Sequence, residues 1–114
     1  MKLRIWWLIE RDYGKGNGGF TYDVESEFEA GMFLNALAEF DMACGVPGNV
    51  GGLNIWEDEE WVDYYNDDGI DFDEIMAENE ADDPDYYTPT TYGEMQQICR
   101  MLARYASDYL FQGC

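Results

Sequence analysis

The sequence predicts a single α+β domain, residues 1–114, with an antiparallel sheet of about four strands and two main helices. The chain is long enough for one domain with a hydrophobic core and too short for two. Short segments rich in β-branched and aromatic residues alternate with turn-forming residues. Two longer segments carry apolar residues at helical spacing behind a capping sequence.

The N-terminal residues predict a hairpin. Residues 3–11 are rich in β-branched and aromatic residues, which predicts a central strand with apolar side chains on both faces. The glycine-rich residues 14–19 predict a turn. Residues 20–24 then return as the antiparallel partner of the first strand.

A helix is predicted after this hairpin. Ser26 and Glu29 have the spacing of a capping box, in which each side chain bonds the other residue's free backbone N–H. We expect a helix over residues 25–44 that lies on the sheet and ends at the turn 45–49. The apolar residues at helical spacing are Phe33, Leu37, Phe40 and Cys44.

Two more strands and a short helix are predicted in the middle of the chain. Residues 53–56 and 61–65 are rich in aromatic and β-branched residues and are joined by an acidic turn at 57–60. Residues 70–81 predict a short acidic helix, and residues 82–89 predict a loop.

The second main helix is predicted near the C-terminus. Thr91 and Glu94 repeat the capping-box spacing, and Gly113 closes the segment. An apolar stripe follows the cap and predicts the core-facing side of the helix. Its residues are Met95, Ile98, Cys99, Leu102, Ala106 and Tyr109.

The sign of the charge is the abnormal feature of the composition. The chain has 25 Asp and Glu, 6 Lys and Arg, and no His, for a net charge of −19. Residues 16–99 contain 22 acids and no base, so every base lies near an end of the chain. Because so large a net charge destabilises a folded chain by self-repulsion, we expect the acids to serve a function.

Three explanations without a specific function compete with this one. Disorder conflicts with an apolar content of 46% and an aromatic content of 17%. Adaptation to high salt favours acids on every surface and gives no reason for the many aromatic residues. Solubility is served equally well by a mixture of both charges. The leading explanation is therefore a basic partner.

The cysteines and the N-terminal apolar run bear on location. Cys44 and Cys99 fall on apolar helix faces, where we expect small core residues, and Cys114 ends the chain. Their number and spacing match no zinc pattern. The apolar run at residues 3–9 contains Arg4, is too short to span a bilayer and lacks a cleavage site. We expect a reduced, cytoplasmic protein without membrane contact.

We expect no enzyme activity and no cofactor. Without histidine the commonest general base is missing, and Cys99 has no visible activating partner. The carboxylates are too numerous for any pair to be singled out, and a glycosidase also needs a cleft between its two acids. The glycine-rich residues 14–19 lack the spacing of a phosphate-binding loop.

A weak calcium-binding protein is a further alternative, because residues 69–75 resemble the second half of an EF-hand loop. With Glu74 at position 12 of the loop, position 6 is Asp68, where the turn requires glycine. With Gly69 at position 6, position 12 is Ile75, which is no ligand. Neither register supplies the ligand set, so we expect no metal site.

The acidic segment after residue 56 has the charge spacing of a nucleic acid. Carboxylates two residues apart on a strand are roughly 6.6 Å apart, and helical i, i+4 pairs about 6 Å. Both spacings are comparable to that of phosphates along one DNA strand, at ~3.4 Å rise per phosphate. Candidate partner-binding acids are Glu57, Asp58, Glu59, Glu60, Asp63, Asp67, Asp68, Asp71, Asp73, Glu74, Glu78, Glu80, Asp82 and Asp83, and candidate aromatic anchors are Trp61, Tyr65, Tyr86 and Tyr87.

In character the chain resembles the DNA-mimicking inhibitors of phages and mobile elements, of anti-restriction and anti-CRISPR type, which are small, acidic and aromatic-rich. Residues 1–65 also resemble, in the order of short motifs, the first domain of the ArdA anti-restriction family. The motifs are Asn17-Gly18, Tyr22-Asp23, Glu27-Phe28 and Glu59-Glu60-Trp61. The chain lacks the multi-domain length of that family, and no functional residue is carried over from it.

The predicted function is inhibition of a nucleic-acid-binding defence or repair enzyme by occupation of its basic groove. The partner is a basic protein, and direct binding of nucleic acid is excluded by charge repulsion. If phages encode the chain, the location is the cytoplasm of a bacterial host. The alternative is an acidic partner of another basic protein, such as an immunity protein, antitoxin or assembly factor.

Overall fold

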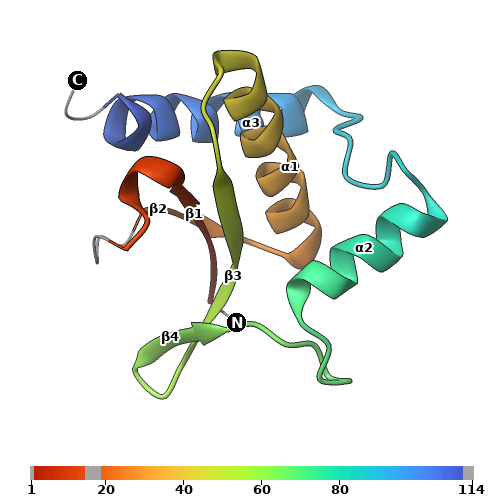
Figure 1. Cartoon of the computed structure of the whole chain (residues 1–114). Helices are drawn as coiled ribbons and strands as arrows, with labels where there is room; N and C mark the ends of the chain where they lie inside the picture. Colours follow the sequence, from red (N-terminus) through yellow and green to blue (C-terminus); the bar gives the residue numbers. More distant parts are fainter. Residues whose placement is uncertain (1, 15–18, 112–114) are drawn as a thin grey trace.

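An antiparallel sheet runs through the middle of the protein in the order β2-β1-β3-β4 (Figure 1). The computed structural model describes residues 2–14 and 19–111. β1 is central and pairs with β2 on one side and β3 on the other, and β4 pairs with β3. The bounds are β1 Leu3–Ile9, β2 Phe20–Val24, β3 Asn49–Glu57 and β4 Glu60–Asp63.

Three α-helices complete the fold, which confirms the predicted α+β class (Figure 1). α1 (Glu27–Cys44) contacts β1, β2 and β3, and α3 (Tyr92–Tyr105) packs against α1. α2 (Phe72–Asp82) contacts β3, and its Glu80 accepts a hydrogen bond from the Asn35 side chain of α1 at 3.5 Å. The short acidic helix predicted over residues 70–81 is therefore present as α2, in addition to the two predicted main helices. No helix within the described residues has the length and apolarity needed to cross a membrane.

β1 alternates between a buried and a half-buried face. Leu3, Ile5, Trp7 and Ile9 are buried on the side of α1, while the intervening residues Arg4, Trp6 and Leu8 are half-buried on the other side. The strand ends at Ile9 because Glu10–Asp12 form a short 3-10 helix. The predicted turn at 14–19 lies largely outside the described residues.

β3 begins earlier than predicted, at Asn49, and includes Gly51 and Gly52. A Cβ at Gly51 would lie 2.3 Å from Trp7 Cε3, and one at Gly52 would lie 2.7 Å from Trp6 Nε1. The two glycines therefore continue the strand beneath two indole rings. Their low strand propensity hid this part of β3 from the sequence analysis.

The helix caps follow the predicted residues. Ser26 accepts a hydrogen bond from the Glu29 N–H at 3.1 Å, but the Glu29 carboxylate accepts from the Glu25 N–H and so completes only half of the capping box. Thr91 and Glu94 form the complete box. Gly45, with φ of 71°, ends α1 in the left-handed conformation that favours glycine.

The core-facing side of α3 differs from the predicted stripe. Met101 and Tyr105 are fully buried, whereas Met95 and Cys99 are exposed. The Tyr105 ring packs on Phe20 and Phe40, and this large side chain fixes which face of the helix meets the sheet.

The prediction that two cysteines are core residues was wrong. Cys44 is exposed because it lies at the last position of α1, beyond the sheet, and Cys99 is exposed because α3 presents another face to the core. Cys114 and Gly113 lie outside the described residues. Beyond α3 the chain continues as a π-helical turn, Ala106–Leu110, which buries Tyr109 and Leu110.

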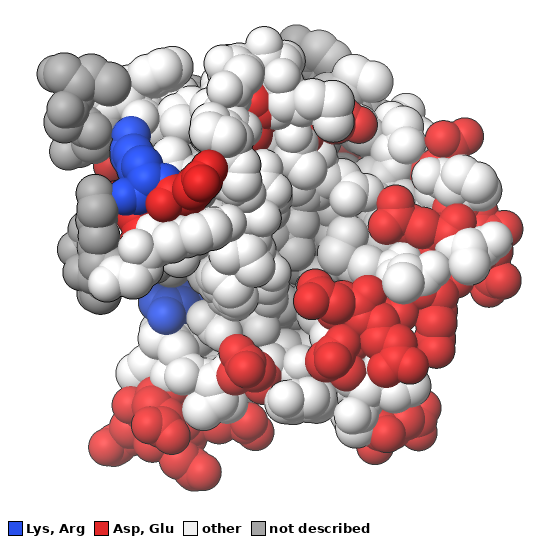
Figure 2. Space-filling model, viewed as in Figure 1, with Lys and Arg blue, Asp and Glu red and all other residues white. Residues whose placement is uncertain are grey.

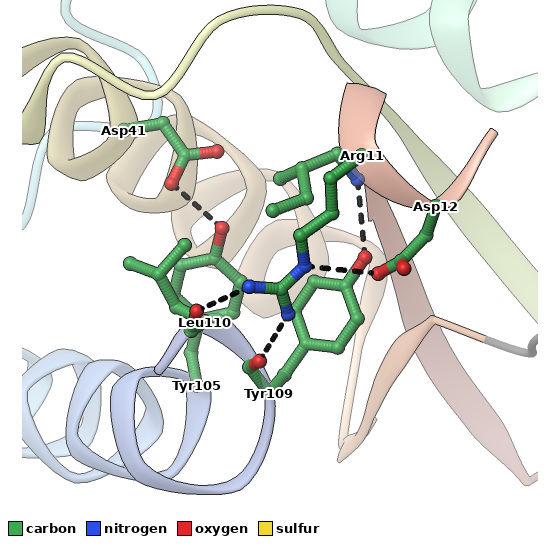
Figure 3. A network of polar contacts seen from close by, with 7 residues as sticks. Arg11, Asp12, Asp41, Tyr105, Tyr109 and Leu110 are labelled. Carbon is green, nitrogen blue, oxygen red and sulfur yellow. Dashed lines mark hydrogen bonds and ion pairs between the residues drawn. The ribbon is translucent and has the colours of Figure 1, made fainter. Parts of the chain in front are cut away.

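Asp41 is the one buried acid of the described core, with an exposed fraction of 0%. Its carboxylate accepts hydrogen bonds from Tyr105 Oη at 2.7 Å, Trp7 Nε1 at 3.0 Å and Asn49 Nδ2 at 3.3 Å. Figure 3 shows Asp41 above the Tyr105 hydroxyl. The four residues come from α1, α3, β1 and β3, so this carboxylate joins the helices to the sheet.

Arg11 makes a second junction, between the end of β1 and the end of the chain (Figure 3). Its guanidinium donates to the backbone carbonyls of Tyr109 and Leu110 and lies 3.4 Å from the Asp12 carboxylate. The Tyr109 hydroxyl accepts from the Ile9 N–H at 3.2 Å. A base thus satisfies carbonyl groups at a helix end, where positive charge is favourable.

We expect Asp41→Ala to lower the free energy of unfolding by at least about 3 kcal/mol, because it leaves three donors without their acceptor. Urea unfolding monitored by circular dichroism measures this value. Glu39→Ala removes the same charge from an exposed position of α1 and should change the free energy little. Equal effects of both substitutions would contradict a structural role for the Asp41 network.

Candidate functional site

The fourteen predicted partner-binding acids form a surface that we call the acidic surface. Figure 2 shows its carboxylates in two groups: one at the tip of the β3–β4 hairpin, at lower left, and one over α2 and the loop before it, at right. All fourteen are exposed except Glu80, which is half-buried. The bases visible in this view lie on the left, away from α2.

The acids of the hairpin group stand on a strained turn. Asp58 and Glu59 have φ of 51° and 67°, the left-handed conformation that two-residue hairpin turns require. Asn-Gly and Asp-Gly are the usual solutions, so Asp58 suits its position, whereas a glutamate in place of the glycine costs roughly 1–2 kcal/mol. Glu57 and Glu60 are paired across the strands beside the turn, so two like charges face one another.

The acids of α2 stabilise the start of the helix and destabilise its later turns. Asp71 caps the helix by accepting from the Glu74 N–H at 2.9 Å, and acids in this first turn suit the helix dipole. Farther along, Glu78 and Asp82 are an i, i+4 pair of like charge, and the last turn contains no base. Only Phe72 and Ile75 of α2 are buried. The helix is therefore anchored by its first turns.

No base among the described residues forms an ion pair with the acidic surface. Within residues 2–14 and 19–111, the ion pairs are Arg11 with Asp12 and Arg104 with Asp108, each at 3.4 Å. Lys2 lies over the rings of Trp56 and Trp61, at 5.3 and 5.4 Å from their centroids. The bases near the hairpin are thus directed to aromatic rings, and the carboxylates stay unpaired.

Three of the four predicted aromatic anchors reach the surface to some degree. Tyr65 is 57% exposed and Tyr86 is 41% exposed, so both are available to a partner. Trp61 is half-buried because the Arg4 guanidinium covers its ring at 4.3 Å. The assignment of Tyr87 as an anchor was wrong. It is 2% exposed, and its ring occupies the space where a side chain at Gly31 would lie.

Tyr64 links the acidic surface to the start of α1. Its hydroxyl donates to the Glu27 carboxylate, and its ring packs on Phe72 of α2. Burial, followed by this hydrogen bond, raises the pKa of Tyr64 to about 12. The tyrosine connection therefore holds α2 beside the sheet while its hydroxyl is protonated.

The EF-hand-like segment at residues 69–75 lies within the acidic surface. Among the described residues, no group of three or more cysteine or carboxylate side chains is placed to hold a metal ion. The residues of the EF-hand-like segment serve other purposes: Asp71 caps α2, and Asn66 closes the preceding turn by accepting from the Asp68 and Ile70 N–H groups. The acidic surface therefore presents exposed negative charge on two elements, the β3–β4 hairpin and α2.

The sequence analysis missed Trp6 and Gly52, which adjoin the acidic surface on the outer face of the sheet. The available signal was the pair Gly51-Gly52 beside a strand, since glycine within a strand often marks a close approach of another group. The pair falls between the turn predicted at 45–49 and the strand predicted at 53–56, so neither prediction includes it.

Comparisons of the chain with protein-family models, with curated proteins and with solved structures gave no match.

We expect Asp58→Asn combined with Glu59→Gly to raise the free energy of unfolding by about 1 kcal/mol, because the new residues suit the left-handed turn. Urea unfolding checks this gain. Asp67→Asn with Asp68→Gly removes the same charge from two residues that themselves have no positive φ, and should give no such gain. A larger gain in that control would mean that charge, not turn strain, limits stability.

We expect the free energy of unfolding to fall as pH rises from about 10 to 12, since the pKa of Tyr64 is raised in the folded state above its ordinary value. The contribution of Tyr64 to the free energy of unfolding is complete at pH values below its pKa in the unfolded state. It is lost as pH rises through its pKa in the folded state. In Tyr64→Phe the fall should be smaller, measured by urea unfolding at several pH values. Tyr65→Phe, at an exposed position, should keep the original slope.

Proposed function

We propose that this protein inhibits a nucleic-acid-binding enzyme, of a host defence or repair system, by placing its acidic surface in that enzyme's basic groove. The observation that carries the proposal is the set of unpaired, exposed carboxylates on the hairpin and α2, in a chain without a base in residues 16–99. Complementary charge of this kind speeds encounter with a basic partner and suppresses binding to acidic ones.

The two supports give the charges a spacing that basic grooves recognise. Along α2, Glu74, Glu78 and Asp82 repeat every four residues, about 6 Å apart on the helix surface. In the hairpin, alternate residues of a strand are roughly 6.6 Å apart. A groove that binds duplex DNA neutralises phosphates with a comparable repeat along each strand.

The loss of stability on this surface supports a selected role. The strained hairpin turn, the facing Glu57 and Glu60, and the like-charged α2 all oppose folding. Where local choices disagree with the stability of the fold, the site is usually functional. Mixed charges would keep the chain soluble without this penalty.

The mechanism requires only steric occlusion and charge complementarity. The enzyme's groove is occupied by the acidic surface, so its nucleic acid cannot enter. Direct binding of nucleic acid by this protein is opposed by the net charge of −19. Of the predicted anchors, Tyr65 and Tyr86 are exposed and available to anchor the complex.

The test is capture from a bacterial lysate, followed by competition on the purified target. We expect the captured protein to bind nucleic acid, to be inhibited by this chain, and to be released by excess duplex DNA and by salt. A complex that duplex DNA does not release would contradict mimicry and would identify a dedicated basic partner instead.

Charge reversal at the hairpin tip gives a matched test. Asp58, Glu59 and Glu60, each changed to Lys, should weaken inhibition at least about 100-fold, since each lost pair contributes on the order of 1 kcal/mol. The same reversal at Glu10, Glu25 and Glu39 produces the same net charge and should weaken inhibition much less. Inhibition constants measure both variants, and equal losses would show that net charge alone matters.

A further inference from the structure

A hollow of about 170 Å³ lies between the outer face of the sheet and the first turn of α2. We call it the Trp6 hollow. Three acids of the acidic surface line it: Asp63 at the end of β4, Asp71 before α2, and Asp73 in the first turn of α2. The lining residues that matter for recognition are Trp6, Gly52, Asp63, Tyr65, Asp71 and Asp73.

An indole ring forms part of this lining because Gly52 leaves room for it. A Cβ at residue 52 would lie 2.7 Å from Trp6 Nε1 and 3.0 Å from Cε2, so any other residue would displace the ring. Trp6 and Gly52 are partners across β1 and β3 and share the outer face. The half-buried indole of Trp6 thus lies directly against the backbone of β3 at Gly52.

Three carboxylates line the same space and keep free acceptor capacity. Asp71 uses Oδ1 to cap α2, and Asp63 Oδ1 accepts from Asn54 at 3.5 Å. Asp73 makes no hydrogen bond to another described residue. No described base pairs with any of the three. The hollow therefore combines an aromatic surface with unpaired negative charge.

This combination suits a guanidinium group. Arginine stacks on aromatic faces, and its planar fork donates to carboxylates in pairs. The chain's own Arg4 makes the aromatic contact on the same sheet face, with its guanidinium 4.3 Å from the Trp61 ring centroid, and its Nε donates to the Asn54 side-chain oxygen at 3.4 Å. A divalent cation fits less well, because indole supplies no oxygen ligand.

We propose that the Trp6 hollow receives an arginine side chain of the basic partner. The identity of that partner rests on the proposed function, but recognition of the guanidinium is a property of this chain. Arginine is favoured over lysine because its planar guanidinium can stack on the indole face and donate to carboxylates in pairs, whereas an ammonium acts as a point charge.

The test uses the isotope-labelled protein and a blocked Gly-Arg-Gly tripeptide, followed by nuclear magnetic resonance at the Trp6 indole N–H. We expect a saturable shift and a dissociation constant about five-fold below that of the Gly-Lys-Gly peptide. The tripeptide containing citrulline, which is uncharged, should give no saturable shift. Equal affinity for the arginine and lysine peptides, or a shift that never saturates, would overturn the proposal.

Two charge-matched variants locate the interaction. Asp63→Asn with Asp73→Asn should weaken binding of the arginine peptide at least about five-fold. Glu78→Gln with Asp82→Asn removes two charges from exposed positions of α2 outside the hollow and should weaken it less than about two-fold. Equal weakening by both variants would attribute binding to the general negative field and would overturn the proposal.

The captured target separates this inference from the proposed function. Suppose that the arginine peptide binds as expected but duplex DNA fails to release the target. Arginine recognition by the Trp6 hollow is then supported, and the proposed mimicry of nucleic acid is contradicted. Suppose instead that duplex DNA releases the target, but the Asp63→Asn, Asp73→Asn variant binds the target as tightly as the α2 control variant does. The proposed mimicry is then supported, and arginine recognition by the Trp6 hollow is contradicted.

Discussion

The hydrogen bonds of Asp41 join α1 and α3 to the sheet, and the hairpin and α2 depend on this core for their support. A buried carboxylate needs partners, and a chain with few bases has few cations to give it. Here Trp7, Asn49 and Tyr105 supply neutral donors in place of a cation. Each donor comes from a different element, so one charge fixes how α1, α3 and the sheet meet.

The distribution of charge follows from the same shortage of bases. Three of the described bases are used locally: Arg11 binds carbonyl groups and Asp12, while Lys2 and Arg4 lie over indole rings. The carboxylates beyond residue 56 consequently remain unpaired on the hairpin and α2. These two elements bury little of their own surface. The aromatic core around α1, α3 and β1 offsets their repulsion and lets them display charge.

Much of the fold follows from local patterns in the sequence, and the errors have a common cause. Caps at Ser26 and Thr91 and the stop at Gly45 depend on neighbouring residues, so their positions are evident from the sequence. The exposed Cys99 and the buried Tyr87 depend instead on which face of an element meets a distant one. Helical spacing identifies an apolar stripe, but only packing against Phe20 and Phe40 decides its centre.

The sequence by itself determined that the chain is α+β, that its charge is negative, and that the acids concentrate after residue 56. These properties are sums over residues or short-range patterns. Only the tertiary structure decided that the acids divide between the hairpin and α2, that Tyr65 is exposed, and that Trp6 lies over Gly52 beside three carboxylates. A hollow is made by residues distant in the chain, and their meeting is fixed by strand register and packing, which local spacing does not encode.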